Sequence, residues 1–293
     1  GELKIQKPIE VLFEGADLQV FKKINDFSHV KEFNTSLDYI KEDFNFLYVG
    51  HWLDGKLGHD RKDTGMLVKT FCSAFSGTKN KPSLILKTSM ATFSILDRNI
   101  ILQKIKDIRS KFNDAPNIYL LHGDLTPDEM NALYNHPKVK AHISFTKGEG
   151  FGRPLLEASI SGKPVIASAW SGQLDFLNPE FTTLLPGDLK NVHKSAQWKG
   201  VINEGTQWFY VNYAIAEKVI RDVYSNYDRY VALAEKQSDY AINNFSLTKM
   251  KNVFLDIINK YVKAAPQHVD IKLPKLKKAG NAPKLSLPKL KKV

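Results

Sequence analysis

The stretch that decides the fold is residues 139–168, "VKAHISFTKGEGFGRPLLEASISGKPVIAS". Its first part, "VKAHISF", is typical of a buried β-strand, because apolar residues follow one another with little interruption. The segment "RPLLEASISG" is typical of a helix, with Pro154 at its start and Gly162 at its end. Since "KPVIAS" is again short and apolar, the stretch predicts two strands of one parallel sheet joined through a helix.

The same alternation extends over residues 28–263. Strand-like runs precede helical patterns in "FNFLYVG" and "DTGMLVKTFCSAF", "PSLILKT" and "RNIILQKIKDIRSKF", and "NIYLLHG" and "TPDEMNALYNH". Thr126 and Glu129 form a capping box before the last of these helices. The pattern predicts an α/β fold, a Rossmann-like parallel sheet with helices on both faces. Two further helical patterns, "DRYVALAEKQSDYAINNF" and "LTKMKNVFLDIINKYV", are expected to close the domain.

The composition indicates an ordinary globular protein. Hydrophobic residues make up 43% and charged residues 25% of the 293 residues, close to globular averages. The chain has no apolar run of about 18 residues and opens with "GELKIQKPIE" rather than a signal peptide. We therefore expect a cytoplasmic location, and attachment to the periphery of a membrane or to a larger assembly stays open. The single Cys72 is expected to be a buried structural thiol.

The net charge of +11 is concentrated at the C-terminal end. Residues 264–293 carry +7 of it and repeat Pro-Lys-Leu three times. Because prolines exclude a continuous helix and lysines oppose collapse, an extended basic tail is expected. It is either a solvated tail or a recognition segment, residues 268–293, for a protein partner or an anionic surface. Nucleic-acid binding is disfavoured, because the tail has no aromatic residue to stack on bases.

The glycine-rich turn "TKGEGFG" has the features of an anion site. It joins the carboxyl end of a strand to a helix N-terminus, whose free N–H groups can bind a phosphate. Gly150 and Gly152 would allow a phosphate close to the backbone. Glu149 and Glu157 flank the turn, and a carboxylate can accept two sugar hydroxyls. The alternative is a capping charge at Glu157 and a solvated charge at Glu149.

Two common phosphate motifs are absent. The turn has Arg153 where the dinucleotide-binding fingerprint needs a third glycine, and no Walker loop occurs in the sequence. The segment at residues 197–224 gathers aromatic residues, which we expect to serve packing, with binding of a partner or an acceptor as the alternative. These are Trp198, Trp208, Phe209, Tyr210 and Tyr213.

Residues 149–177, "EGFGRPLLEASISGKPVIASAWSGQLDFL", resemble the signature of family 4 glycosyltransferases, whose E-x7-E motif would run from Glu149 to Glu157. Three other segments match in order. "IEVLFEGADLQVF" resembles the family's hinge, "FLYVGHW" with "DRKDTGMLVKTF" its first strand, phosphate lysine and first helix, and "IYLLHGDLTPDEMNALY" the strand and turn near the nucleotide base. The resemblance spans roughly residues 8–263.

The resemblance implies the GT-B fold, in which two Rossmann-like domains enclose the active site. This chain would be the C-terminal, donor-binding domain. Residues 1–27 would be a hinge segment from an absent N-terminal half, residues 28–263 the donor-binding domain, and residues 264–293 the tail. An enzyme of this kind would be a retaining hexosyltransferase that takes a nucleotide-diphosphate sugar as donor, with no metal and no cofactor. The acceptor is not indicated.

The resemblance also assigns roles to residues. Glu149 would hold the transferred sugar, Glu157 would hold the donor ribose, and Lys62 would neutralise the diphosphate as the sugar leaves. The backbone amides expected to bind the diphosphate or the sugar are those of Phe151, Gly152 and Arg153. In agreement with metal-free chemistry, the sequence contains no D-x-D or H-E-x-x-H motif, and its eight histidines are scattered.

This sequence departs from the family pattern in two places. His51 stands where the family usually has arginine, and the insertion "WLDGKLGHD" follows it. One phosphate anchor is therefore unassigned, and Arg61 or Lys56 would supply it. The chain also begins at the expected hinge, with Gly1, so we expect it to be incomplete for catalysis. The alternative function is a glycosyltransferase-like domain that serves as a non-catalytic interaction module, tethered through its basic tail.

Overall fold

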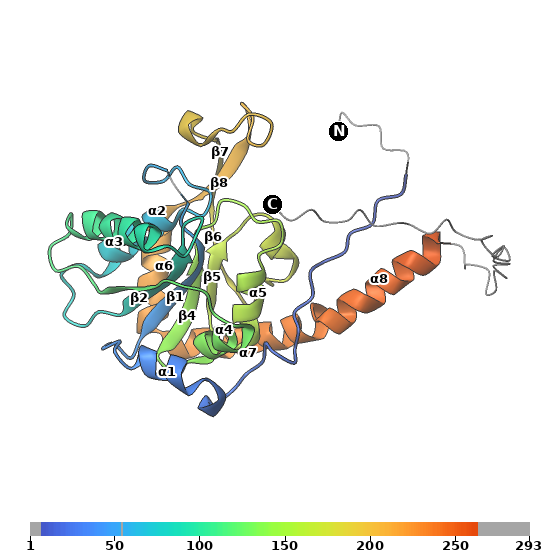
Figure 1. Cartoon of the computed structure of the whole chain (residues 1–293), viewed down its shortest axis with the longest axis horizontal. Coiled ribbons are helices and arrows are strands. Elements are labelled where there is room, and N and C mark those ends of the chain that lie inside the picture. The colour runs from blue at the N-terminus through green and yellow to red at the C-terminus, as the bar shows by residue number, and fades with distance from the viewer. Residues whose placement is uncertain (1–6, 54, 263–293) are drawn as a thin grey trace, which may run out of the picture.

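A computed structural model describes residues 7–53 and 55–262 of the chain (Figure 1). The expected tail lies outside these residues, as do residues 1–6 of the expected hinge.

A six-stranded parallel sheet forms the centre of the fold (Figure 1). Its strands are β1 (Asn45–His51), β2 (Ser83–Ser89), β3 (Ile118–Leu121), β4 (Val139–Ser144), β5 (Val165–Ser168) and β6 (Thr183–Leu185). They lie in the order β3-β2-β1-β4-β5-β6, which is the Rossmann order. The direction in which strands are added reverses between β1 and β4. The carboxyl ends of these two strands therefore flank the crevice in which such sheets bind ligands.

Helices cover both faces of the sheet. On one face lie α2 (Thr64–Phe75), α3 (Ile95–Arg109) and α6 (Tyr213–Ser225), and on the other lie α1 (Lys31–Leu37), α4 (Pro127–Asn135), α5 (Arg153–Ile160) and α7 (Tyr227–Asn244). Successive residues of a strand point to opposite faces. Thus Phe46 of β1 packs into the first core and Leu47 into the second. The predicted Rossmann-like fold is confirmed.

Several local predictions are also confirmed. Thr126 and Glu129 make both hydrogen bonds of the capping box before α4. Gly162 follows the end of α5 with a φ of 73°, a left-handed conformation that suits glycine. Cys72 is fully buried, and burial raises the pKa of its thiol to about 11. These features depend on neighbours in the sequence, which is why they could be read directly from it.

An antiparallel hairpin, β7 (Gly187–Asn191) and β8 (Gln207–Val211), is added beyond β6. In Figure 1 it stands at the same end of the molecule as the segment after β1. Its connection contains the short 3-10 helix η3 (Lys194–Ala196), and two others, η1 (Ser28–Val30) and η2 (Gly172–Asp175), precede α1 and follow β5.

The last helix, α8 (Leu247–Tyr261), does not close the domain as expected. It extends away from the sheet (Figure 1), and none of its residues is buried. Residues 7–15 run beside it, where Glu10 accepts a hydrogen bond from Lys260 Nζ at 2.7 Å. The amphipathic pattern of α8 was read correctly as helical, but the pattern does not say against what a helix packs. Among the helices described, none has both the length and the apolar composition needed to cross a bilayer.

Candidate functional site

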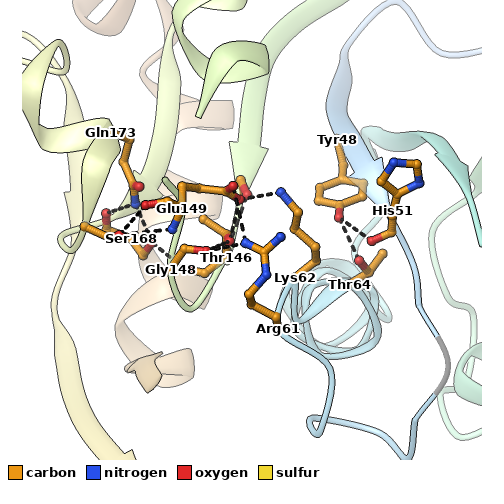
Figure 2. Close-up of polar contacts among 12 residues, drawn as sticks. Tyr48, His51, Arg61, Lys62, Thr64, Thr146, Gly148, Glu149, Ser168 and Gln173 are labelled. Atoms are coloured by element: carbon orange, nitrogen blue, oxygen red, sulfur yellow. Dashed lines mark hydrogen bonds and ion pairs between the residues drawn. The ribbon is translucent and has the colours of Figure 1, made fainter. Parts of the chain in front are cut away.

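Two loops meet at the crevice between β1 and β4 (Figure 2). Residues 52–63 connect β1 to α2 and bring Arg61 and Lys62, and residues 145–152 connect β4 to α5 and bring Glu149. Lys62 Nζ lies 2.5 Å from Glu149 Oε1, and Arg61 Nη1 lies 3.3 Å from Glu149 Oε2. Three of the residues predicted from the sequence are thus in direct contact, although 87 positions separate Lys62 from Glu149.

The Glu149 carboxylate accepts hydrogen bonds on both oxygens. Oε1 accepts from Lys62 and from the Thr146 hydroxyl, the latter at 2.6 Å, and Oε2 accepts from Arg61. Burial alone would raise the pKa of Glu149, but Lys62, Thr146 and Arg61 together hold it below its ordinary value. Burial also lowers the pKa of Lys62, against the opposing effect of Glu149. A negative carboxylate and two cationic side chains therefore share a partly buried site at neutral pH.

The backbone of Glu149 is fixed by the turn after β5. Ser171 Oγ accepts a hydrogen bond from Glu149 N at 3.0 Å and donates one to Glu149 O at 2.6 Å. Gly172 N donates to the same carbonyl at 3.2 Å. A Cβ on Gly172 would lie 2.0 Å from Gly150 O, so only glycine allows this approach. The turn after β5 therefore packs closely against Glu149, Gly150 and Phe151.

A network of buried polar groups supports the same loop (Figure 2). Ser168 Oγ donates to Thr146 O at 2.6 Å, and Gln173 Nε2 donates to Ser168 O and Oγ at 3.0 Å. All three side chains are buried. Hydrogen bonds thus connect Gln173 in η2 to Ser168 in β5, and Ser168 to Thr146. The Thr146 hydroxyl in turn bonds the Glu149 carboxylate.

Lys147 connects the loop of Glu149 to the loop of Lys62. Its Nζ lies 3.1 Å from Asp63 Oδ1 and donates to Gly58 O at 2.6 Å and Asp60 O at 2.9 Å. The Lys147 N–H donates to Arg61 O at 2.9 Å. This fully buried lysine therefore sets the distance between the cationic and the acidic side of the site.

The β7–β8 hairpin covers Lys147. Its Nζ lies 4.3 Å from the centroid of the Tyr210 ring and 5.6 Å from that of Trp208, so cation–π attraction adds to the ion pair. Tyr213 donates from its hydroxyl to Asp63 Oδ2 at 2.5 Å. Much of the aromatic cluster is therefore packed, as expected, around a buried charge that the sequence did not reveal. Trp198 is the exception and is exposed.

The start of α5 has the backbone geometry expected for the predicted anion cradle. Gly152 is the N-cap residue with a φ of 98°, Arg153 begins the helix, and Pro154 follows. The first N–H groups of any helix have no intrahelical acceptor and carry a partial positive charge. Gly150 has open space around the position of a Cβ, so the backbone is accessible there. The Phe151 ring is buried beneath, against Phe176.

Glu157 lies apart from Glu149, on the first turns of α5. Tyr134 donates to its Oε2 at 3.3 Å, and Arg153 Nη2 lies 3.2 Å from its Oε1. Burial raises the pKa of Glu157, while Arg153 and Tyr134 oppose the rise. The Arg153 side chain is largely exposed, so it can leave without breaking a packed contact.

A cavity of about 320 Å³ opens next to Lys62. It lies at the carboxyl ends of β1 and β2 and reaches Asp124 in the loop before α4 and Pro154 in α5. The segment "IYLLHGDLTPDEMNALY", which the resemblance places near the nucleotide base, thus borders the same cavity as Lys62 through Asp124. His51 also lines it, with its Nδ1 3.2 Å from both Ser89 Oγ and Met90 O.

The structure separates the two candidates for the missing phosphate anchor. Arg61 reaches the site, whereas Lys56 lines a different cavity, between Trp52 and α3. Among the residues with described positions, no group of three or more histidine, cysteine, aspartate or glutamate side chains could hold a metal ion.

Sequence reasoning missed four residues of the site. Ser171, Asp63 and Lys147 act through tertiary contacts, and Thr146 is a single hydroxyl within the quoted turn. For Lys147 a signal was available in the sequence, because "TKGEG" places this lysine two positions before Glu149 at the end of a buried strand. Asp63 and Ser171 also adopt positive φ, of 54° and 79°, which is rare for residues other than glycine.

Part of the chain matches a known family. Residues 103–196 match the model described as "Glycosyl transferases group 1". The matched region includes Glu149, Glu157 and all of α5, and it leaves out Arg61 and Lys62. A curated relative, "Uncharacterized protein 356" of Sulfolobus islandicus rod-shaped virus 1, is 27% identical over 153 residues, which are 52% of this chain and 41% of that protein.

Solved structures share the fold at low sequence identity. The Anabaena protein Alr3699/HepE, in complex with UDP-glucose, has a TM-score of 0.59 at 14% identity, over 86% of this chain and 57% of that one. Sucrose-phosphate synthase from Thermosynechococcus elongatus gives 0.57 at 15%, over 84% and 51%. The C-terminal domain of the glycosyl transferase group 1 family protein LpcC from Francisella tularensis gives 0.53 at 14%, over 80% and 100%. The chain therefore spans about half the length of the first two proteins.

Proposed function

We propose that this chain binds a nucleotide-diphosphate sugar at the β1–β4 crevice, as the donor-binding domain of a retaining, metal-independent glycosyltransferase of family 4. The acceptor would be held by a domain outside this chain. The observation that carries the proposal is the contact of Lys62 and Arg61 with Glu149, at the edge of the cavity beside α5. This arrangement offers two cations to a diphosphate and a carboxylate to a sugar.

The ion pairs at Glu149 suggest how the donor is received. A diphosphate carries more negative charge than one carboxylate, so it would attract Lys62 and Arg61 away from Glu149. The Glu149 carboxylate would keep its bond from Thr146 and regain free acceptor positions. Those positions match the paired hydroxyls of a sugar ring. Donor binding would thus replace the ion pairs at Glu149 by contacts with the donor. The two cations would contact the diphosphate, and Glu149 would contact the sugar.

The rest of the donor would lie along α5. The N–H groups that open this helix would bind the diphosphate, as helix N-termini do for many phosphates. Glu157 would accept the ribose hydroxyls once the exposed Arg153 side chain moves away from Oε1. The base would enter the cavity near residues 122–125.

In the reaction, this chain would stabilise the departing diphosphate. Negative charge develops on that group as the bond to the sugar breaks, and Lys62 with Arg61 is placed to balance it. The buried ion pair of Lys147 and Asp63 would keep both cations in place. Because closure of an acceptor domain over the donor would exclude water from the reacting sugar, we expect little transfer without such a domain.

The comparisons support the class of ligand. The Anabaena protein was solved in complex with UDP and glucose and with UDP-glucose, and its fold covers most of this chain. The Francisella domain, which this chain covers completely, is described as the C-terminal domain of a group 1 glycosyl transferase. The alternative function, an interaction module tethered by its tail, depends on residues 268–293, which lie outside the described part of the chain, and no described residue favours it.

Calorimetric titration with UDP, GDP and ADP tests the proposal. We expect one of them to bind, with weakened binding for Lys62→Ala and unchanged binding for Lys56→Ala, because Lys56 lines another cavity. Folding of each variant is checked by circular dichroism. A folded protein that binds none of the three would refute the donor-binding function.

A further inference from the structure

Ser171 has a backbone conformation that its residue type rarely adopts. Its φ is 79° and its ψ is −164°, a region that is essentially restricted to glycine and costs about 1–3 kcal/mol for other residues. Such strain persists only where surrounding contacts fix it. A glycine here would remove the strain, so the serine side chain must contribute something that glycine cannot.

The contribution of the side chain is visible in its two hydrogen bonds. Ser171 Oγ accepts from Glu149 N and donates to Glu149 O, so one hydroxyl holds both polar groups of that residue's backbone. A serine with a negative φ would turn Cβ elsewhere and lose at least one of these bonds. The strained conformation is therefore the one that brings the hydroxyl to Glu149.

The constraint matters most when a donor is bound, and this step rests on the proposed function. Without a donor, Lys62, Arg61 and Thr146 all orient the Glu149 carboxylate. With Lys62 and Arg61 turned to a diphosphate, only Thr146 and the backbone would orient it. The backbone position is set by Ser171 and by Gly172 N.

We propose that Ser171 is a positioning residue that aims the Glu149 carboxylate at the sugar of the donor and so determines how strongly the sugar is preferred. Among the described residues, its side-chain hydrogen bonds go to Glu149 and not to Lys62, Arg61 or the N–H groups that open α5. Its removal should therefore weaken the recognition of the sugar and leave the recognition of the diphosphate unchanged.

Two variants separate the hydroxyl from the strain. Ser171→Ala removes the hydroxyl and keeps an unfavourable φ, whereas Ser171→Gly removes the hydroxyl and permits that φ. Sugar preference should follow the hydroxyl and be lost equally in both, while thermal stability should follow the backbone and be lower in the alanine variant. Ser161→Ala is the matched control, because it removes a buried serine hydroxyl bonded to Ala158 O at the opposite end of α5.

The measurement is the ratio of the dissociation constants of a nucleoside diphosphate and its sugar conjugate, taken by calorimetry for UDP with UDP-glucose, GDP with GDP-mannose and ADP with ADP-glucose. For the diphosphate and sugar conjugate that the wild type prefers, we expect this ratio to fall about five- to tenfold in both Ser171 variants. A fall of this size corresponds to the loss of one to two hydrogen bonds. The affinity for the bare diphosphate should change less than about twofold in the same variants. This is a few tenths of a kcal/mol, as expected for a site that has lost no contact.

The outcomes are distinguishable. Retention of the ratio in either Ser171 variant, or a ratio that follows thermal stability, overturns the role of Ser171. A wild type that binds a diphosphate but prefers none of the sugar conjugates also overturns it and leaves diphosphate binding intact. A wild type that binds no diphosphate instead refutes the proposed function, on which the inference rests.

Discussion

Lys147 Nζ lies 3.1 Å from Asp63 Oδ1, and neither side chain is exposed to solvent. The two residues belong to the two loops that form the candidate site, one after β4 and one after β1. Their neighbours in sequence, Glu149 and Lys62, form the ion pair at its centre. The buried pair is therefore the structural link on which the geometry of the Lys62–Glu149 pair depends.

Lys147→Met should destabilise the fold by about 3–5 kcal/mol, because removal of one partner leaves a buried charge without compensation. Burial already raises the pKa of Asp63 to about 6 in the presence of Lys147. The loss should therefore be larger at pH 8, where Asp63 must ionise, than at pH 5. Urea unfolding at the two pH values measures it.

Two controls accompany this variant. Lys190→Met removes an exposed lysine that lies over the same Tyr210 ring and should change stability little. Adding Asp63→Asn to Lys147→Met should recover part of the loss, because the buried carboxylate that has lost its direct cationic partner is then removed. A single variant as stable as the wild type at pH 8 would contradict the importance of the pair.

Lys62→Ala should weaken the binding of the preferred nucleoside diphosphate about ten- to a hundredfold. A hydrogen bond to a charged group contributes about 1.5–3 kcal/mol, and about 1.4 kcal/mol corresponds to a factor of ten. Arg61→Ala should have an effect in the same direction, since Arg61 shares the carboxylate with Lys62. Equal binding by Lys62→Ala and Lys56→Ala would show that the diphosphate lies elsewhere.

Glu149→Gln should have opposite effects on the two parts of the donor. The amide cannot hold Lys62 as an ion pair, so the lysine becomes more available and the bare diphosphate should bind at least as tightly as in the wild type. The preference for the sugar conjugate should disappear, because one acceptor oxygen has become a donor. Competition binding with both ligands measures the change. Weaker binding of the bare diphosphate would mean that Glu149 does not compete for Lys62.

His142→Leu should raise stability and reduce its pH dependence. The imidazole is buried in β4, neither ring nitrogen has a hydrogen-bond partner among the residues that the structure describes, and burial lowers its pKa to about 3. A lowered folded pKa means that the unfolded chain binds the proton more tightly. The folded protein therefore keeps its full stability above pH 6.5, the ordinary pKa of histidine. It loses stability as the pH falls toward 3.

The leucine variant removes this contribution, so its stability should fall less steeply across that range, by up to about 1.4 kcal/mol per pH unit for one proton. At pH 7 it should gain about 1–3 kcal/mol from the loss of unpaired polar atoms. Unfolding curves from pH 7 to pH 4 test both statements. An unchanged slope would show that His142 takes up no proton on unfolding.

The site was predictable where its parts are local. The E-x7-E spacing from Glu149 to Glu157, the glycines between them and the start of α5 all lie in one continuous stretch, so the turn and the helix could be read from it. The structure places the two carboxylates differently, with Glu149 among cations and Glu157 between Tyr134 and Arg153. That the two carboxylates bind the sugar and the ribose of one donor is part of the proposed function.

Lys62 could be named as a site residue only through the family resemblance, and its contact with Glu149 was not predicted. Ser171 and Asp63 could not be named at all, because their roles come from backbone strain and from residues 22 and 84 positions away. The same limit applies to α8. Its pattern of apolar residues predicts a helix, but the helix has no buried residue because the body of the domain does not reach it.

The sequence by itself determined strands β1 to β5, most of the helices and the alternation that makes a two-sided parallel sheet, but not β6 or the β7–β8 hairpin. These depend on periodicity, capping and glycine, which act over a few residues. Only the tertiary structure decided that β4 lies against β1, and with it that Lys62 meets Glu149, that Lys147 meets Asp63 and that Ser171 holds the Glu149 backbone. Strand order is fixed by the packing of the whole sheet, so contacts across it have no signature in any local stretch of the chain.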